Sequence, residues 1–422
     1  MSMTRRWCVL AAALGLLAQA GVPVRLEAAT YYVHQGGMGD FVTIQEGIDA
    51  ASAGDSVLVA AGTYAEHLYV GASSDGICLL SESGPEATVI DGEDMAGQPV
   101  LFLEDLGSQT AIVGFSIVRG RNNSWGAGVR CENASPEIRG NIVRDNLGQT
   151  GFGGGIGVHS GSPWIVSNHF EENQSPDGGA INIWDGAAVI ESNTFLGNVA
   201  WGFGGTNGGG GVQVLGGSPS IIGNTFEANE ASIGGAIEFQ GGDNVTVQGN
   251  SFVQNTAGSG GAIEVWYCGT DIQIVGNVFS GNVGLNRGAG MYVRSSDADE
   301  TFIVSDNVFH NNSGDMATIT IGRQSNPTIS SNVLVNLTPY EVGAHESQIP
   351  DTLNASGNWW GTTDPAAIAA RVWDCADDPA LCCVAVDPWC TEPTCNGQMT
   401  GLPESEENGP VTWGYLKSIY RR

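Results

Sequence analysis

Two glutamates are the residues of this sequence best suited to acid–base chemistry. Glu238 and Glu264 each follow the tetrapeptide Gly-Gly-Ala-Ile, so they hold equivalent positions in two copies of one pattern. If the copies are neighbouring parallel strands, the side chains lie about 4.8 Å apart, near the ~5–5.5 Å between the carboxyl groups of a retaining glycosidase. Backbone stacking gives this spacing to any two residues of one column. The pair is therefore a weak catalytic candidate, and an ordinary solvated face is the plainer interpretation.

Aromatic side chains beside these glutamates are candidates for carbohydrate binding. Trp184 and Trp266 would offer flat apolar surfaces to a sugar, and Gln240 and His159 would offer partners for its hydroxyl groups. Aligning the glycine-led segments gives two columns of side chains, which we expect to point outward. The first column holds Arg130, Gly157, Asn182, Gln213, Glu238, Glu264 and Tyr292, and the second holds Glu132, His159, Trp184, Leu215, Gln240, Trp266 and Arg294.

An asparagine repeat sets the positions of these columns. In most copies the Asn is followed two residues later by Phe and preceded three residues earlier by Ile. We expect each Asn at a turn, in left-handed geometry, with its side chain bonded to the backbone of the next coil rather than to a ligand. The nine copies are Asn141, Asn168, Asn193, Asn224, Asn250, Asn277, Asn307, Asn332 and Asn358.

Each repeat contains about three short strand patterns and no helical pattern. The glycine-led strand alternates apolar and polar residues, as in Ile237 and Phe239, which is typical of a strand with one buried face. Repeats of this length that stack strand on strand form a parallel β-helix. A propeller is the main alternative, but its four-stranded antiparallel blades need longer repeats. The sequence therefore predicts an all-β parallel β-helix of about 11–12 coils over residues 30–361.

Both ends of such a stack need a cover, because unpaired strand edges invite other chains. Thr43 and Glu46 have the spacing of a capping box, and Ile44 and Ile48 share one helical face. Residues 43–53 are therefore predicted to form a helix that covers the first coil. At the other end, residues 362–400 are predicted to be a Cys-rich cap, followed by an acidic linker and tail over 401–422.

The chain has the features of an exported protein. Residues 1–20 resemble a secretory signal peptide, with Arg5 and Arg6, an apolar run and a small-x-small end, so we expect a secreted or cell-surface protein. Clustered cysteines in an exported chain favour disulfides. Zinc is the alternative, but the cluster holds no His and no paired Cys-x-x-Cys. The disulfide candidates are Cys375, Cys382, Cys383, Cys390 and Cys395.

The charge balance restricts the partners. Asp and Glu number 45 against 15 Lys and Arg, a formal net charge of −30, so a nucleic-acid partner is excluded because phosphates need a basic footprint. No later segment is apolar enough to span a membrane. We expect a monomer without a cofactor. No metal-binding motif is present, although the acidic surface could bind Ca²⁺ through oxygen ligands.

The N-terminal motif resembles the opening of pectin-lyase-like β-helix proteins, including pectinesterases. The resemblance covers residues 39–48, Gly-Asp-Phe-Val-Thr-Ile-Gln-Glu-Gly-Ile, and residues 62–66, Gly-Thr-Tyr-Ala-Glu. It implies a right-handed coil. It does not imply an activity, because the pectinesterase motifs Gln-Asp-Thr-Leu and Asp-Phe-Ile-Phe-Gly and the polygalacturonase motif Gly-His-Gly are absent from this sequence.

The central repeats resemble those of polymorphic outer-membrane proteins, which belong to adhesin passenger domains. The resemblance covers about residues 126–312 and lies in Gly-Gly-Ala-Ile alternating with Phe-x-x-Asn. The closing residues 358–362, Asn-Trp-Trp-Gly-Thr, resemble the last coil of secreted bacterial β-helix repeat proteins. Those outer-membrane proteins end in a large translocating barrel, and too few residues follow Trp360 here to form one.

Two functional classes stay open at this point. The favoured one is a non-enzymatic carbohydrate-binding, adhesin-like or structural protein of the cell surface, with extracellular or cell-wall polysaccharide as partner. The alternative is a polysaccharide lyase, esterase or glycoside hydrolase of the pectin-lyase-like superfamily. The missing catalytic motifs and the scarcity of basic residues favour the first.

Overall fold

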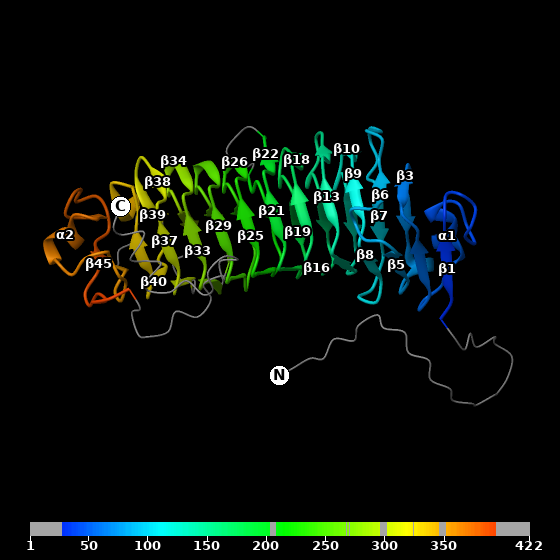
Figure 1. Ribbon diagram of the computed structural model, residues 1–422. Helices are drawn as coiled ribbons and strands as arrows, with labels where there is room; N and C mark the ends of the chain where they lie inside the picture. The colour runs from blue at the N-terminus through cyan, green and yellow to red at the C-terminus, as the bar shows by residue number, and fades with distance from the viewer. Residues whose placement is uncertain are drawn as a thin grey trace, which may run out of the picture.

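The chain coils into one long parallel β-helix. The computed structural model describes residues 28–202, 208–266, 268–269, 271–295, 302–323, 325–345 and 352–393. Its strands form stacked parallel sheets of 12, 8, 12 and 11 strands, in which each strand pairs with the equivalent strands one coil before and one coil after. The coils succeed one another along a single axis from the blue end to the orange end (Figure 1). The predicted parallel β-helix of about 12 coils is confirmed.

Four long sheets line the coil. The first sheet contains β1 (Thr30–Val33), β2 (Ser56–Val59), β5 (Cys78–Ser81), β8 (Ala111–Val113), β12 (Glu137–Arg139), β16 (Trp164–Val166), β20 (Val189–Glu191), β24 (Ser220–Ile222), β28 (Thr246–Gln248), β32 (Ile272–Val275), β36 (Phe302–Ser305) and β40 (Thr328–Ser330). The second sheet contains β3 (Gly62–Tyr64), β6 (Thr88–Asp91), β9 (Ser116–Val118), β13 (Ile142–Arg144), β17 (His169–Glu171), β21 (Thr194–Leu196), β25 (Thr225–Glu227), β29 (Ser251–Val253), β33 (Val278–Ser280), β37 (Val308–His310) and β41 (Val333–Val335).

In the other two sheets the strands flank the turn glycine of each coil: the strand of the short sheet comes before it in the chain and the strand of the glycine-led sheet comes after it. The short sheet contains β10 (Arg121–Asn122), β14 (Leu147–Gly148), β18 (Gln174–Ser175), β22 (Val199–Ala200), β26 (Glu230–Ile233), β30 (Thr256–Ser259), β34 (Val283–Arg287) and β38 (Ser313–Gly314). The glycine-led sheet contains β4 (Leu68–Val70), β7 (Leu101–Glu104), β11 (Val129–Glu132), β15 (Ile156–His159), β19 (Ile181–Asp185), β23 (Val212–Val214), β27 (Ile237–Phe239), β31 (Ile263–Trp266), β35 (Met291–Ser295), β39 (Ala317–Arg323), β42 (Tyr340–His345) and β44 (Val372–Trp373).

The central coils have four strands each, not the three predicted. The additional strand is the one of the short sheet, such as β14 or β18, which is only two residues long. A pair of residues is too short to show the alternation that identifies a strand in a sequence. These short strands form a sheet of their own, which in each coil comes just before the turn glycine.

The interior is filled by like side chains stacked on like. Neighbouring phenylalanines lie with ring centroids 4.3–5.1 Å apart and nearly parallel planes. One side chain per coil therefore fills the same position in six successive coils, which explains why the apolar residue after the repeated Asn hardly varies. The stack consists of Phe170, Phe195, Phe226, Phe252, Phe279 and Phe309.

The repeated asparagines form a hydrogen-bonded ladder inside the turns. Asn193 is typical: its Nδ2 donates to the backbone carbonyl of Ile165 at 2.9 Å and to Oδ1 of Asn224 at 3.0 Å. The same Oδ1 accepts from the backbone N–H of Asn193 at 2.8 Å. The left-handed residue of the turn is the one before the Asn, for example Ser192 at φ 57°, so the predicted left-handed position was wrong by one residue.

A second ladder runs parallel to the first, five residues further along each coil. It passes from Asn146 through successive coils to Asn312 and then Asn336. The last amide donates to Oε2 of the buried Glu341 at 2.7 Å. A carboxylate therefore ends this ladder at the point where its amide donors have no further Asn to meet.

A capped helix covers the N-terminal end, as Figure 1 shows. Helix α1 (Ile44–Ala50) begins after Thr43, and Thr43 and Glu46 form the predicted capping box. The carboxylate of Glu66 accepts from the backbone N–H groups of Ile44 and Gln45 at 2.9 and 3.0 Å. The two N-terminal motifs of the sequence therefore meet at the start of one helix. The helix ends at Ala50, three residues before the predicted end.

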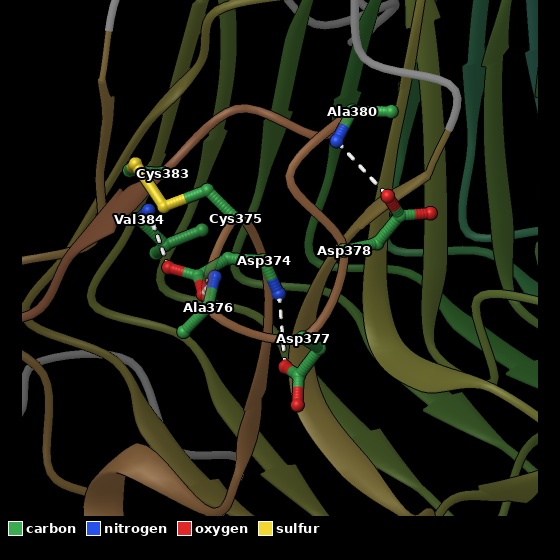
Figure 2. The surroundings of a disulfide bond; sticks show 8 residues. All are labelled: Asp374, Cys375, Ala376, Asp377, Asp378, Ala380, Cys383 and Val384. Carbon is green, nitrogen blue, oxygen red and sulfur yellow. Dashed lines mark hydrogen bonds between the residues drawn. A yellow bond between two sulfur atoms is a disulfide. The ribbon is translucent and has the colours of Figure 1, made fainter.

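The opposite end carries a second cap. It contains α2 (Pro365–Ala369), with Asp364 as N-cap, and a small parallel pair of β43 (Leu353–Asn354) with β45 (Val384–Ala385). Figure 2 shows the disulfide between Cys375 and Cys383 in this cap. Beside it, Asp374 accepts from the backbone N–H groups of Ala376 and Val384 at 2.9 and 2.8 Å. A disulfide here fits the predicted Cys-rich cap.

The structure describes some of the remaining cap cysteines but not the terminal segments. Cys390 is disulfide-bonded, whereas Cys382 is a buried free cysteine. Cys395, the predicted signal peptide at 1–20 and the predicted tail at 401–422 lie outside the described residues. One further short element, the 3-10 helix η1 (Ala72–Ser74), interrupts an early coil. No helix of the described part is long and apolar enough to cross a membrane.

Candidate functional site on the glycine-led sheet

The strand register places the two predicted columns on the outward side of the glycine-led sheet. Glu238 pairs with Glu264 in the next coil and with Gln213 in the coil before. The first column is however buried at its centre, where Glu238 is 0% and Glu264 2% exposed. Asn182 and Gln213 are also fully buried. The predicted solvated face is therefore wrong for this stretch of the column.

The segment before each turn glycine covers these polar side chains. In the Glu238 region this segment includes Gly208, which forms a parallel bridge with Ile233. A Cβ added to Gly208 would lie 2.9 Å from Oε2 of Glu238, so the backbone itself contacts the carboxyl group. One coil earlier, Asp177 Oδ1 accepts from Gln213 Nε2 at 3.2 Å. The chain thus folds over the column instead of leaving it open to solvent.

Beneath this cover the polar groups form a third ladder. Asn182 Nδ2 donates to Gln213 Oε1 at 2.5 Å, and Gln213 Nε2 donates to Glu238 Oε2 at 2.8 Å. Burial raises the pKa of Glu238 well above its usual value, and the hydrogen bond from Gln213 opposes that rise. Burial also raises the pKa of Glu264 to about 8, against the opposing charges of Arg294 and Arg287.

A group of aromatic rings lies beside the glycine-led sheet, from the coil of β11 to the coil of β19, which is two coils before that of Glu238. We call Trp125, Phe152, His159 and Trp184 the aromatic cluster. Trp125 stacks on Phe152 with centroids 4.5 Å apart, and Trp184 meets the two rings edge-on at 5.2 and 5.9 Å. His159 lies 5.0 Å from Trp125 and 6.4 Å from Trp184. Trp184 is 46% exposed, so the cluster presents a supported aromatic surface to solvent.

A β-bulge directs Trp184 into this cluster. The register of β15 and β19 shifts after Val158, so His159 pairs with Asp185 rather than with Trp184. The predicted second column, which aligned His159 with Trp184, is therefore wrong by one residue at this coil. The additional residue lets the indole turn toward Trp125 and Phe152, as bulges often re-aim a side chain.

Trp125 and Phe152 are the cluster members that sequence reasoning missed. Both stand one residue before a turn glycine, Gly126 or Gly153, and they form a parallel bridge with each other. Two large aromatic residues at the same repeat position, next to a residue of positive φ, could have been noticed in the sequence. They lie outside the glycine-led strands, whose alternating apolar and polar residues are the clearer pattern in the sequence.

The second predicted tryptophan has a different environment. Trp266 is half-buried, and the guanidinium of Arg294 lies 4.7 Å from its ring centroid. It is three coils from Trp184, or about 14 Å at the usual strand spacing. Gln240 follows β27 and is half-buried. The structure thus brings His159 and Trp184 together, and leaves Trp266 and Gln240 apart from them.

The described residues provide no group of three or more His, Cys, Asp or Glu side chains arranged to hold a metal ion. The Ca²⁺ possibility raised by the acidic composition stays a prediction.

Comparison with family models agrees with the fold of the central coils. A family model described as "Right handed beta helix region" matches residues 188–336. Among solved structures, pectin methylesterase from carrot is similar, with 12% sequence identity, a TM-score of 0.33, and coverage of 80% of this chain and 89% of that chain. No curated protein matches the chain. The family match agrees with the stacked coils of the central region, and its description is that of a right-handed coil.

Proposed function

We propose that this protein is a non-enzymatic, monomeric β-helix of the cell exterior that binds carbohydrate through the aromatic cluster. The observation that carries the proposal is the exposed indole of Trp184, held edge-on by Trp125 and Phe152. The predicted signal peptide supports the location.

The cluster has the properties that a sugar site needs. A pyranose ring has an apolar face that packs on an indole, and an indole fixed by neighbouring rings loses little conformational entropy on binding. His159 and the exposed Asp185 stand beside the rings and can exchange hydrogen bonds with hydroxyl groups. The net charge of −30 disfavours a polyanionic glycan, so we propose a neutral or weakly charged one.

A glycan array tests this proposal. The labelled full chain should bind a subset of neutral glycans, and Trp184→Ala should lose that binding. Trp201→Ala is the matched control, because Trp201 is similarly exposed, at 39%, and follows β22 of the short sheet rather than joining the cluster. Absence of binding to any glycan, or equal binding by Trp184→Ala, would reject the proposal.

A polysaccharide-degrading enzyme is the second candidate function. The raised pKa values of Glu238 and Glu264 are the observation that favours it, because a general acid must hold its proton near neutral pH. Their burial opposes it, because a substrate would reach them only if the covering segment opened. Reducing-end and unsaturated-product assays over a polysaccharide panel, with and without Ca²⁺, decide the matter: turnover that Glu238→Gln abolishes would establish the enzyme.

A further inference from the structure

Two carboxyl oxygens on the covered outward side of the glycine-led sheet lack a hydrogen-bond partner among the described residues. They are Oε1 of Glu238 and Oε2 of Glu264. Both side chains are almost completely buried. A buried acceptor without a donor costs about 1–3 kcal/mol, and more when it is charged. Each of the two oxygens therefore needs a hydrogen-bond donor.

The two carboxyl groups belong to adjacent positions of one column. Glu238 in β27 and Glu264 in β31 are register partners, so their backbones are one strand spacing apart. The other oxygen of Glu238 already accepts from Gln213. Glu238 and Glu264 are therefore neighbours in the same column, and a proton on one carboxyl group would supply a donor that the other lacks.

The surrounding charges differ for the two groups. Glu238 accepts from Gln213, whose amide also bonds Asp177. The charged groups that act on Glu238 are the carboxyl groups of Glu264 and Asp177, and both raise its pKa. Glu264 faces Arg294 and Arg287, which favour its carboxylate form.

Further neighbours of Glu264 also distinguish it from Glu238. Ser259 of β30 forms a hydrogen bond that favours the charged form of Glu264. Tyr292 of β35 is the next member of the column, and the guanidinium of Arg287 lies 5.6 Å from its ring centroid. Glu238 is thus placed to keep a proton and Glu264 to accept its hydrogen bond.

We propose that Glu238 and Glu264 form a hydrogen-bonded carboxyl pair, in which the protonated Oε1 of Glu238 donates to Oε2 of Glu264. This pair is a pH-sensitive contact between two neighbouring coils. The proton comes from solvent when the chain folds and returns to solvent when the pair ionises. Ionisation leaves two negative charges in one buried column, so the two coils repel each other at this point. This inference is independent of the carbohydrate-binding proposal.

The direction of the pH effect follows from the raised pKa values. An unfolded Glu titrates near 4.5, whereas the pKa of folded Glu264 is about 8 and that of Glu238 is also raised, both mainly by burial. Between these values the folded chain holds more protons than the unfolded chain, so stability is greatest below about pH 4.5 with respect to this pair and falls as the pH rises toward 8 and beyond.

Urea unfolding of the full chain from pH 5 to pH 9 tests the pair. Glu238→Gln places an amide N–H where the acid O–H stood, so its donor does not titrate. We expect the wild-type midpoint to fall with pH and the Glu238→Gln midpoint to fall by about half as much or less. Glu230→Gln, in the exposed Glu230 of β26, is the control and should follow the wild type. If Glu238→Gln does not fold, Glu264→Gln provides the same test.

Infrared spectroscopy provides a second readout. At pH 7 the wild type should show the C=O stretch of protonated carboxylic acids, and Glu238→Gln should weaken it by the contribution of Glu238. A wild-type spectrum without that band, or a midpoint at pH 7 that falls on adding EDTA and recovers with Ca²⁺, would show a bound cation in place of the proton and overturn the proposal. Parallel pH profiles for the wild type and Glu238→Gln would overturn it as well.

Discussion

At the scale of single residues, the buried amides and the exposed indole have opposite roles. Asn224 shows the structural role: its Oδ1 accepts two hydrogen bonds from Asn193, and its Nδ2 donates to the carbonyl of Ile190 and to Asn250. Every partner is a buried polar group, and such groups are almost always hydrogen-bonded in folded proteins. Trp184, in contrast, has a side chain that is 46% exposed.

Replacing one amide of the ladder should therefore be costly. Asn224→Ala leaves the backbone N–H of Asn193 and the carbonyl of Ile190 without partners, and each buried unsatisfied group costs about 1–3 kcal/mol. We expect a loss of at least about 2 kcal/mol in the free energy of unfolding, measured by urea denaturation. Asn123→Ala, at an exposed position, should change it by less than about 0.5 kcal/mol. Similar losses for the two variants would contradict the ladder's role.

At the scale of elements, the caps close the two ends of the solenoid. Helix α1 has its first backbone N–H groups satisfied twice, by the Thr43–Glu46 capping box and by the carboxylate of Glu66 from a later turn. A carboxylate at a helix N-terminus also interacts favourably with the helix dipole. The cap is thus attached to the first coils by a contact between distant segments, not by the helix sequence alone.

Removal of the distant carboxylate should loosen the N-terminal cap. We expect Glu66→Ala to lower the free energy of unfolding by about 1–2 kcal/mol, in the range of a lost N-cap. Hydrogen exchange should speed up first in α1 and β1, while the central coils keep their protection. Glu86→Ala, at an exposed Glu for which the structure gives no helix contact, is the control. Unchanged exchange in α1 would contradict this account of the cap.

The elements also show what the sequence could predict and what it could not. The Asn and Phe spacing predicted the stacked coils, because a residue that must meet its own equivalent in the next coil cannot vary. The short strands such as β14 have no such spacing, and so the layer they build was missed. Glu238 and Glu264 were placed outward correctly, but alternation does not distinguish a face covered by another segment from a face covered by water. The bulge at Trp184 was missed for a similar reason, since one additional residue leaves no mark in a single sequence.

At the scale of the whole molecule, the dominant features are the continuous core and the negative charge. The stacked phenylalanines and the two Asn ladders run through most coils, so each coil depends mainly on its neighbours, as expected for a solenoid. With 45 acidic against 15 basic residues, the folded rod concentrates like charges that the unfolded chain keeps further apart.

Salt should therefore stabilise the protein. Raising NaCl from about 0.01 M to about 0.15 M shortens the Debye length from about 30 Å to about 8 Å and screens this repulsion. We expect the thermal midpoint to rise by several degrees at neutral pH, measured by circular dichroism. Sodium sulfate at equal ionic strength controls for specific chloride binding. A midpoint that falls with salt would show that ion pairs such as Arg119 with Asp91 outweigh the net repulsion.

The central claim, that the aromatic cluster is the ligand site, is tested most directly by calorimetric titration of the best glycan from the array into three proteins. The account predicts that Trp184→Ala weakens the dissociation constant at least about tenfold, equivalent to about 1.4 kcal/mol, with an unchanged unfolding midpoint, while Trp201→Ala binds as the wild type does. Equal dissociation constants for the wild type and Trp184→Ala would contradict it.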